Sequence, residues 1–300
     1  MAILLFCGAI FSMYSSEIRI RDSLQGELIF SDEMGNVPEI AKIEIETPQG
    51  KLTLQKDESL WRIMEADNYY ASFSKIQKLL DNITEARLGK KVPALNSEII
   101  WKTIRLFDSK NKETSAVQIG KNINQNMYYV RRLNSAEIYF STWKMNFSDN
   151  LYSWAKQPLL DFNAKDIQRI ENKSIAVSRR DEGAAFYHEQ EQKIYKQKDY
   201  LKVFGILTDL HYENVLSSQE FSPELYPYTQ SMILTTFGGL MTEITIYTNK
   251  KEYWLKIRLS ANRLPQETTN RYIAQNKFLY DDWWFKISAE DGIGLFNFNL

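Results

Sequence analysis

The chain has 300 residues, of which 44% are hydrophobic and 25% are charged, a balance typical of folded globular domains. The 37 Lys and Arg residues nearly balance the 38 Asp and Glu residues, which argues against a protein that binds nucleic acid. The single cysteine, Cys7, excludes an internal disulfide. Two histidines, His188 and His211, are too few for an ordinary structural zinc site.

The chain begins with an apolar run at residues 2–13, followed by a charged stretch at residues 17–21. A run of about a dozen residues is too short to span a bilayer but long enough for a signal-peptide core. No basic residue precedes the run and no small-residue cleavage site follows it. We expect residues 1–26 to be an anchor or signal-like segment with its lead-in. If the sequence starts inside a longer anchor, the shortness of the run and the missing basic residues are both explained. The alternative is that the run is a buried strand or helix of a cytoplasmic domain.

Alternating apolar residues next predict a small antiparallel meander at residues 40–63, with a turn at Pro48-Gln49-Gly50. A helix follows, because apolar residues recur at helical spacing. Those residues are Ile76, Leu79, Leu80 and Ile83. Further strands are expected at residues 103–107, 116–120, 127–130 and 137–140.

The same order of elements returns in the second half of the chain at one constant spacing, which indicates an internal repeat. The stretch Ile167-Gln168-Arg169-Ile170-Glu171 matches Ile40-Ala41-Lys42-Ile43-Glu44, and the helix pattern returns at Val203, Ile206, Leu207 and Leu210. A short helix at residues 151–154 precedes the joint. Later strands are expected at residues 232–236, 243–247, 254–259, 271–274 and 277–280. We therefore predict an α+β fold of two tandem similar units, residues 27–160 and 161–300, each a mainly antiparallel sheet with a packed helix.

Several of these segments, in this order, resemble a known bacterial family. They are Glu27-Leu28-Ile29-Phe30, Lys51-Leu52-Thr53-Leu54, Trp61-Arg62-Ile63, Val117-Gln118-Ile119-Gly120-Lys121 and Leu159-Leu160-Asp161-Phe162. The family is a domain of unknown function with an N-terminal membrane segment, encoded beside gliding-motility-type ABC transporter subunits. The resemblance covers residues 27–260. It implies an extracytoplasmic α/β region with an auxiliary or scaffold role, and it assigns no catalytic residue.

Reactive side chains form no recognisable constellation in the sequence. No serine lies in a Gly-x-Ser-x-Gly motif, and Gly238-Gly239 lacks the context of a phosphate-binding loop. The acid pairs Asp281-Asp282 and Glu290-Asp291 are typical of solvated turns. We therefore expect no catalytic residue, no metal site and no cofactor.

One aromatic cluster is the candidate interaction surface: Tyr280, Trp283, Trp284 and Phe285. Strand side chains alternate between two faces, so the four cannot all lie on one face of a sheet. Exposed members would be able to stack on a glycan or on a partner protein. The alternative is that all four close the end of the core.

These features together predict a non-catalytic interaction or scaffold protein, anchored in a membrane with an extracytoplasmic domain. Its expected partners are envelope or transporter proteins of an ABC-type transport or motility system, and nucleic acid is not among them. The alternative is an envelope protein that binds or hydrolyses polysaccharide.

Overall fold

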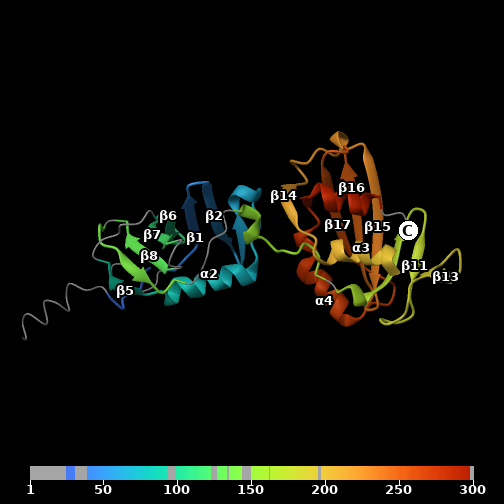
Figure 1. Cartoon of the computed structure of the whole chain (residues 1–300), viewed down its shortest axis with the longest axis horizontal. Helices are drawn as coiled ribbons and strands as arrows, with labels where there is room; N and C mark the ends of the chain where they lie inside the picture. The colour runs from blue at the N-terminus through green and yellow to red at the C-terminus, as the bar shows by residue number, and fades with distance from the viewer. Residues whose placement is uncertain are drawn as a thin grey trace, which may run out of the picture. The chain divides into compact units, whose positions relative to one another are not determined.

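The computed structural model describes residues 25–30, 39–92, 99–122, 127–133, 135–143, 150–161, 163–194 and 197–297. By its contacts the chain divides into two compact units (Figure 1). The first is Met1–Met64 with Phe73–Asn150, and the second is Glu65–Ser72 with Leu151–Leu300. The anchor expected at residues 2–13 lies outside the described residues. None of the described helices is long and apolar enough to cross a membrane.

The described residues form two antiparallel sheets of nine strands each. The first sheet contains β1 (Lys42–Thr47), β2 (Gly50–Asp57), β3 (Leu60–Ile63), β4 (Tyr69–Tyr70), β5 (Leu88–Lys91), β6 (Ile100–Phe107), β7 (Glu113–Asn122), β8 (Met127–Arg132) and β9 (Tyr139–Ser141). The second contains β10 (Ile167–Asn172), β11 (Ala176–Ser178), β12 (Tyr187–His188), β13 (Lys193–Ile194), β14 (Tyr212–Ser217), β15 (Tyr228–Thr236), β16 (Leu240–Thr248), β17 (Tyr253–Ala261) and β18 (Trp283–Ile287).

The two sheets have the same strand order. The first runs β3-β2-β1-β6-β7-β8-β9-β5 through the first unit, and the second runs β12-β11-β10-β15-β16-β17-β18-β14. In each, the strand that follows the helix lies at the far edge of the sheet, beside the last strand of that unit. Two similar, mainly antiparallel sheets are therefore confirmed.

Equivalent apolar residues occupy the centre of each sheet. In the first sheet Ile43 pairs with Leu54 on one side and with Leu106 on the other, and all three side chains are fully buried. In the second sheet Ile170 pairs with Val177 and with Leu234. Alternation along each strand places these residues on one face, so burying that face fixes the register.

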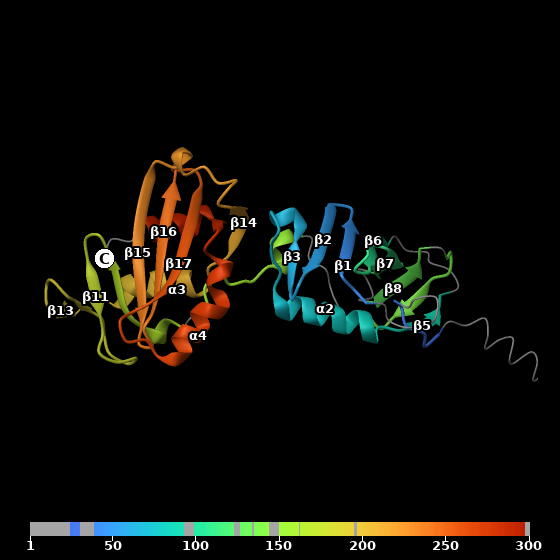
Figure 2. The ribbon, with the colours of Figure 1, turned by 180° about the vertical axis from the view of Figure 1, so that it is seen from behind.

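One helix in each unit matches the predicted repeat. The helix α2 (Phe73–Glu85) runs along the first sheet (Figures 1 and 2), and its buried residues are Ile76, Leu79 and Ile83. Leu80, expected on the buried face, is only half-buried, because the face turned inwards centres on Leu79. In α3 (Gln197–Thr208) the predicted burial of Val203 and Leu207 is confirmed, as is that of Leu210 just beyond the helix.

The fold is mainly β, with few helices among the described residues. The strands expected at residues 271–274 and 277–280 are wrong: the chain forms α4 (Glu267–Asn276) and the 3-10 helix η5 (Lys277–Leu279). Thr269 Oγ1 donates a hydrogen bond to the carbonyl of Gly238 at 2.7 Å, which ties the helix to the β15–β16 turn. The short helix expected at residues 151–154 is the 3-10 helix η2 (Leu151–Trp154). The last helix is α5 (Ala289–Phe296).

The segment Glu65–Ser72 belongs to the second unit although the chain enters and leaves it from the first. Tyr69 is 1% exposed and lies with its ring centre 5.0 Å from that of Trp283 and 5.7 Å from that of Phe285. Its hydroxyl donates to the carbonyl of Leu279 at 3.1 Å. The second unit's core is therefore completed by a residue that precedes most of the first unit in sequence.

Candidate functional site

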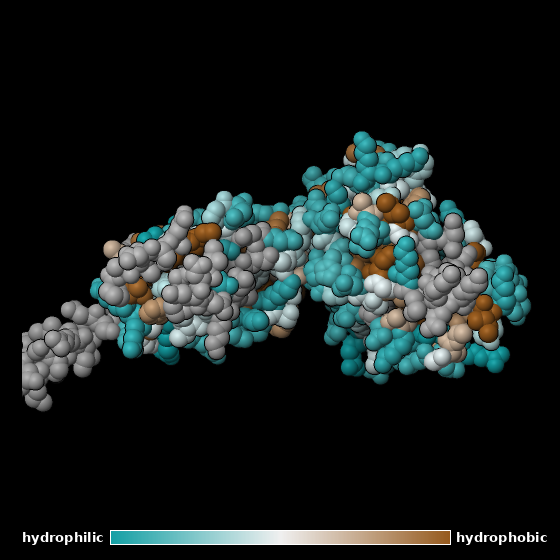
Figure 3. Space-filling model, in the orientation of Figure 1, coloured by the Kyte–Doolittle hydropathy of each residue, from teal (hydrophilic) through white to brown (hydrophobic). Residues whose placement is uncertain are grey.

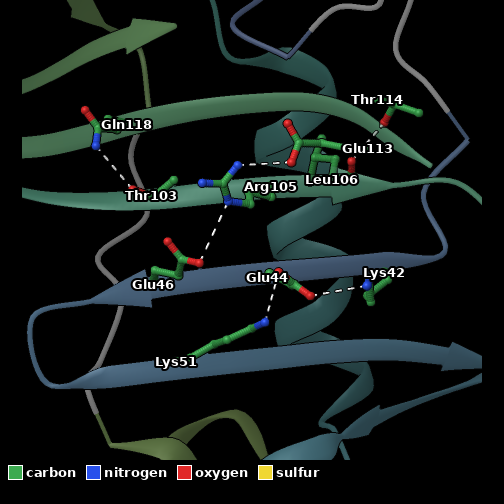
Figure 4. Close-up of polar contacts among 10 residues, drawn as sticks. All are labelled: Lys42, Glu44, Glu46, Lys51, Thr103, Arg105, Leu106, Glu113, Thr114 and Gln118. Carbon is green, nitrogen blue, oxygen red and sulfur yellow. Dashed lines mark hydrogen bonds and ion pairs between the residues drawn. The ribbon is translucent and has the colours of Figure 1, made fainter. Parts of the chain in front are cut away.

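Polar side chains cover the face of the first sheet opposite its apolar core (Figure 4). In β1 the buried Ile43 and Ile45 alternate with polar residues, and pairing with β2 and β6 extends the polar rows across the sheet. We call this surface the polar face. It consists of Lys42, Glu44, Glu46, Lys51, Thr103, Arg105, Glu113, Gln118 and Arg131.

Ion pairs order the centre of the polar face. Glu44 lies 3.2 Å from Lys42 Nζ and 3.0 Å from Lys51 Nζ, and its side chain is only 13% exposed. Burial raises the pKa of the Glu44 carboxyl, but hydrogen bonds from the two lysines outweigh it and leave the pKa below its ordinary value. Arg105 likewise lies between two carboxylates, 3.0 Å from Glu113 and 3.8 Å from Glu46.

A second row crosses β6, β7 and β8. Gln118 donates a hydrogen bond to Thr103 Oγ1 at 3.3 Å, and Arg131 Nε donates to Gln118 Oε1 at 2.6 Å. The Arg131 guanidinium lies 4.6 Å from the ring centre of Trp101. A Cβ on Gly120, which pairs with Trp101, would lie 2.2 Å from Ile99 Cγ2 and 3.1 Å from the indole, so the absent side chain leaves room for both neighbours. The row holds a cation against an aromatic ring.

The second sheet repeats this row. Ser231 and Thr245 share a hydrogen bond of 3.0 Å, and Lys256 is the strand partner of Thr245, as Arg131 is of Gln118. Lys256 Nζ lies 5.2 Å from the ring centre of Trp284 and donates to Ser218 Oγ at 3.1 Å. Burial lowers the pKa of the Lys256 ammonium.

The sequence repeat did not reveal these paired cations. The spacing of the repeat relates Gln118 to Thr245. Arg131 and Lys256 are separated by slightly fewer residues than Gln118 and Thr245, so that spacing does not align them. The reason is that the β7–β8 hairpin is longer than the β16–β17 hairpin, as the pairs Ile119–Val130 and Ile246–Leu255 show. A search that allowed this insertion would have aligned the two cations.

The predicted aromatic cluster lies in the core of the second unit. Tyr280, Trp283, Trp284 and Phe285 are 1%, 7%, 7% and 0% exposed. Tyr280 follows η5, whereas Trp283, Trp284 and Phe285 lie in β18 and face both of its sides, as alternation requires; each side is covered. Trp283 and Phe285 pack around Tyr69, and Trp284 stacks on Phe221 with ring centres 3.9 Å apart. These four residues are therefore buried and do not form an exposed aromatic surface, because Tyr69 and Phe221, from distant parts of the chain, pack over the two sides of β18.

The other residues singled out in the sequence lie apart from one another. His188 is buried and its Nδ1 accepts a hydrogen bond from the backbone N–H of Glu191 at 3.1 Å, whereas His211 is exposed. The Ser288 hydroxyl caps α5 by accepting from the Asp291 N–H at 3.1 Å. Across the described residues, no three His, Cys, Asp or Glu side chains are placed to hold a metal ion.

Two cavities of the second unit have mixed linings. One of about 950 Å³ borders the β11–β12 hairpin and includes Arg169 and Glu189, which pair with each other at 2.9 Å. The other, of about 800 Å³, lies between α3 and α5. Its lining combines apolar and acidic residues with one lysine and one histidine.

A family model for a domain of unknown function, DUF4340, matches residues 61–230. The matched stretch runs from β3 into β15 and includes the segment Glu65–Ser72 and the helices α2 and α3. Neither the curated proteins nor the solved structures that were compared contain a match. Since the family model covers more than half of the 300 residues, the chain belongs to the DUF4340 family.

Proposed function

We propose that the protein is a non-catalytic interaction protein whose first sheet binds a partner protein through the polar face. The observation that carries this proposal is the set of positively and negatively charged side chains that ion pairs hold in place on one face of the sheet. Glu44 at the centre is held by two lysines, while Lys51 and Glu113 at the rim keep 47% and 42% of their side chains exposed. A preordered array loses little entropy on binding, and exposed rim charges select a complementary partner.

The surface composition supports recognition by polar groups. On the face shown in Figure 3 the described surface is mainly hydrophilic, and hydrophobic residues form small separate patches. A broad apolar patch, which often marks an obligate interface, is not seen on the described part of this face. A partner would therefore be selected here by charge and hydrogen bonding.

The proposed setting is the bacterial cell envelope. The apolar run at residues 2–13 supports a membrane anchor, with everything after residue 17 on the extracytoplasmic side. The resemblance to proteins encoded beside ABC transporter subunits supports an auxiliary role in such a transport or motility system. Its partners in this proposal are the transporter subunits or other envelope proteins.

Polysaccharide binding or hydrolysis is the weaker candidate. That role drew its support from the aromatic cluster at residues 280–285, whose four aromatic side chains are all buried. On the polar face, the charged side chains form ion pairs with each other. Such a surface suits a protein interface better than a sugar-binding cleft.

Affinity purification from membranes tests the proposal. The full chain and a variant with Lys51→Glu and Glu113→Lys would be purified in parallel, and co-purifying transporter subunits quantified by mass spectrometry. These rim residues are exposed, so the exchange leaves the core intact. We expect about a tenfold loss of a subunit, the effect of about 1.4 kcal/mol.

The matched control exchanges the same charges on exposed residues of the second unit, Lys173→Glu and Glu224→Lys. This control should retain every partner. An unchanged set of partners in the polar-face variant would refute the proposed role. Protease protection tests the location: the second unit should be digested once the outer barrier is opened with the inner membrane intact, and protection until the inner membrane is lysed would exclude the envelope setting.

A further inference from the structure

Two helices of the second unit border a groove of about 800 Å³. The groove is lined from α3 and the residues just after it by Lys202, Gly205, Ile206, Asp209 and His211, and from α5 by Glu290, Asp291, Ile293 and Gly294. The first four follow the spacing i, i+3, i+4 and i+7, so they form one stripe along that helix. We call this surface the α3–α5 groove.

Glycines open the floor of the α3–α5 groove. A Cβ built on Gly205 would have no heavy atom within 4 Å, so the space above it is free. A Cβ on Gly294 would lie 2.5 Å from Ile206 Cδ1, which shows that the two helices approach closely there. Ile293, on the wall of the groove, is 49% exposed. The groove therefore has an apolar interior that is accessible from outside.

Carboxylates surround this apolar interior. Asp291 is engaged with the Ser288 hydroxyl at 2.8 Å. Asp209 Oδ1 lies 3.6 Å from His211 Nδ1, and Glu290 makes no hydrogen bond or ion pair with any of the described residues. Lys202 is the one Lys or Arg among the lining residues. The rim is therefore mainly acidic, and Glu290 is available to a cationic ligand.

We propose that the α3–α5 groove binds a basic amphipathic helix of a partner protein. An apolar side chain of that helix occupies the space above Gly205, between Ile206 and Ile293. Its lysines or arginines lie beside Asp209 and Glu290. Helix-in-groove recognition uses such spaced apolar anchors, and complementary charge selects the basic partner. The same carboxylates repel an anionic lipid surface.

This surface adds a second, independent contact to the proposed interaction protein. It is built from residues of the second unit alone, whereas the polar face belongs to the first. Failure of one test therefore leaves the other unaffected.

The probe is a synthetic amphipathic peptide of about 14 leucine and lysine residues at helical spacing, a length near the limit for an isolated helix. Its affinity for the purified full chain is measured by calorimetry, and the site by hydrogen exchange. We expect slower exchange in α3 and α5 when the peptide is bound. In Gly205→Phe, whose Cβ meets no neighbour and whose ring fills the free space, the dissociation constant should rise at least about tenfold.

Charge variants complete the experiment. Glu290→Gln should weaken binding severalfold, whereas Glu224→Gln, an exposed carboxylate outside the groove, should not. Unchanged binding in Gly205→Phe, or equal binding of a leucine–glutamate peptide, would overturn the proposal. A change in the oligomeric state of free Gly205→Phe would identify the occupant as a second copy of the chain and would also overturn it.

Discussion

Replacing Tyr69 tests whether Glu65–Ser72 completes the core of the second unit. The ring is 1% exposed and contacts Tyr212, Trp283 and Phe285, with ring centres 6.1, 5.0 and 5.7 Å away. Truncating a buried aromatic residue to alanine costs about 3–5 kcal/mol. Tyr69→Phe keeps the ring and loses the hydroxyl with its 3.1 Å hydrogen bond to Leu279, at a cost of about 1 kcal/mol.

Hydrogen exchange of the full chain measures these costs separately in each unit, because a chain of two units need not unfold in one step. Tyr69→Ala should speed exchange of the most protected amides at residues 151–297 by about a hundredfold or more. Leu264→Ala, which removes a 91% exposed leucine from the same unit, should change stability by less than about 0.5 kcal/mol. If Tyr69→Ala instead releases only amides of residues 73–143, the assignment of its segment to the second unit is wrong.

Three further predictions use the same structure. By chemical denaturation, Leu79→Ala should cost about 2–5 kcal/mol and the half-buried Leu80→Ala clearly less, since only Leu79 is fully enclosed; equal costs would contradict the helix orientation. Gly205→Ala should raise the melting temperature through helix propensity, whereas Gly292→Ala should lower it because its Cβ would lie 2.1 Å from a buried tyrosine ring. Folding lowers the pKa of the Glu44 carboxyl below its ordinary value of 4.5. The ionised carboxylate therefore stabilises the fold fully at a pH above 4.5, and this stabilisation is lost as the pH falls through the folded pKa. Glu44→Gln should therefore reduce the loss of stability in acid, and an unchanged pH profile would contradict this.

Local patterns in the sequence were sufficient to predict the faces of the main strands. Alternating apolar residues predicted strands at residues 40–63 and 116–120, and the structure forms β1, β2, β3 and β7 there, with Ile43 and Val117 buried. The constant spacing of the repeat was sufficient to predict two similar sheets, since Val117 and Ile244 occupy equivalent positions. These features follow from the chain alone because side-chain alternation is a property of each strand by itself.

The candidate site depended on contacts that no local pattern encodes. The polar face could be drawn along β1 from sequence, but the pairing of Glu44 with Lys51 and of Arg105 with Glu113 required the register between strands. Residues 271–274 include Tyr272 and Ile273, residue types that favour strands, yet they form part of α4. That outcome reflects contacts such as that of Thr269 with Gly238, which the sequence does not reveal.

Only the tertiary structure decided that the aromatic residues at positions 280–285 are buried. The sequence predicted that the aromatic cluster around Trp283 and Trp284 faces both sides of a strand, which is correct, but not which segments lie over each side. Tyr69 covers one side and Phe221 the other, and both come from much earlier in the chain. Burial is decided by whatever segment packs against a residue, and when that segment is distant in sequence only the folded chain brings the two together.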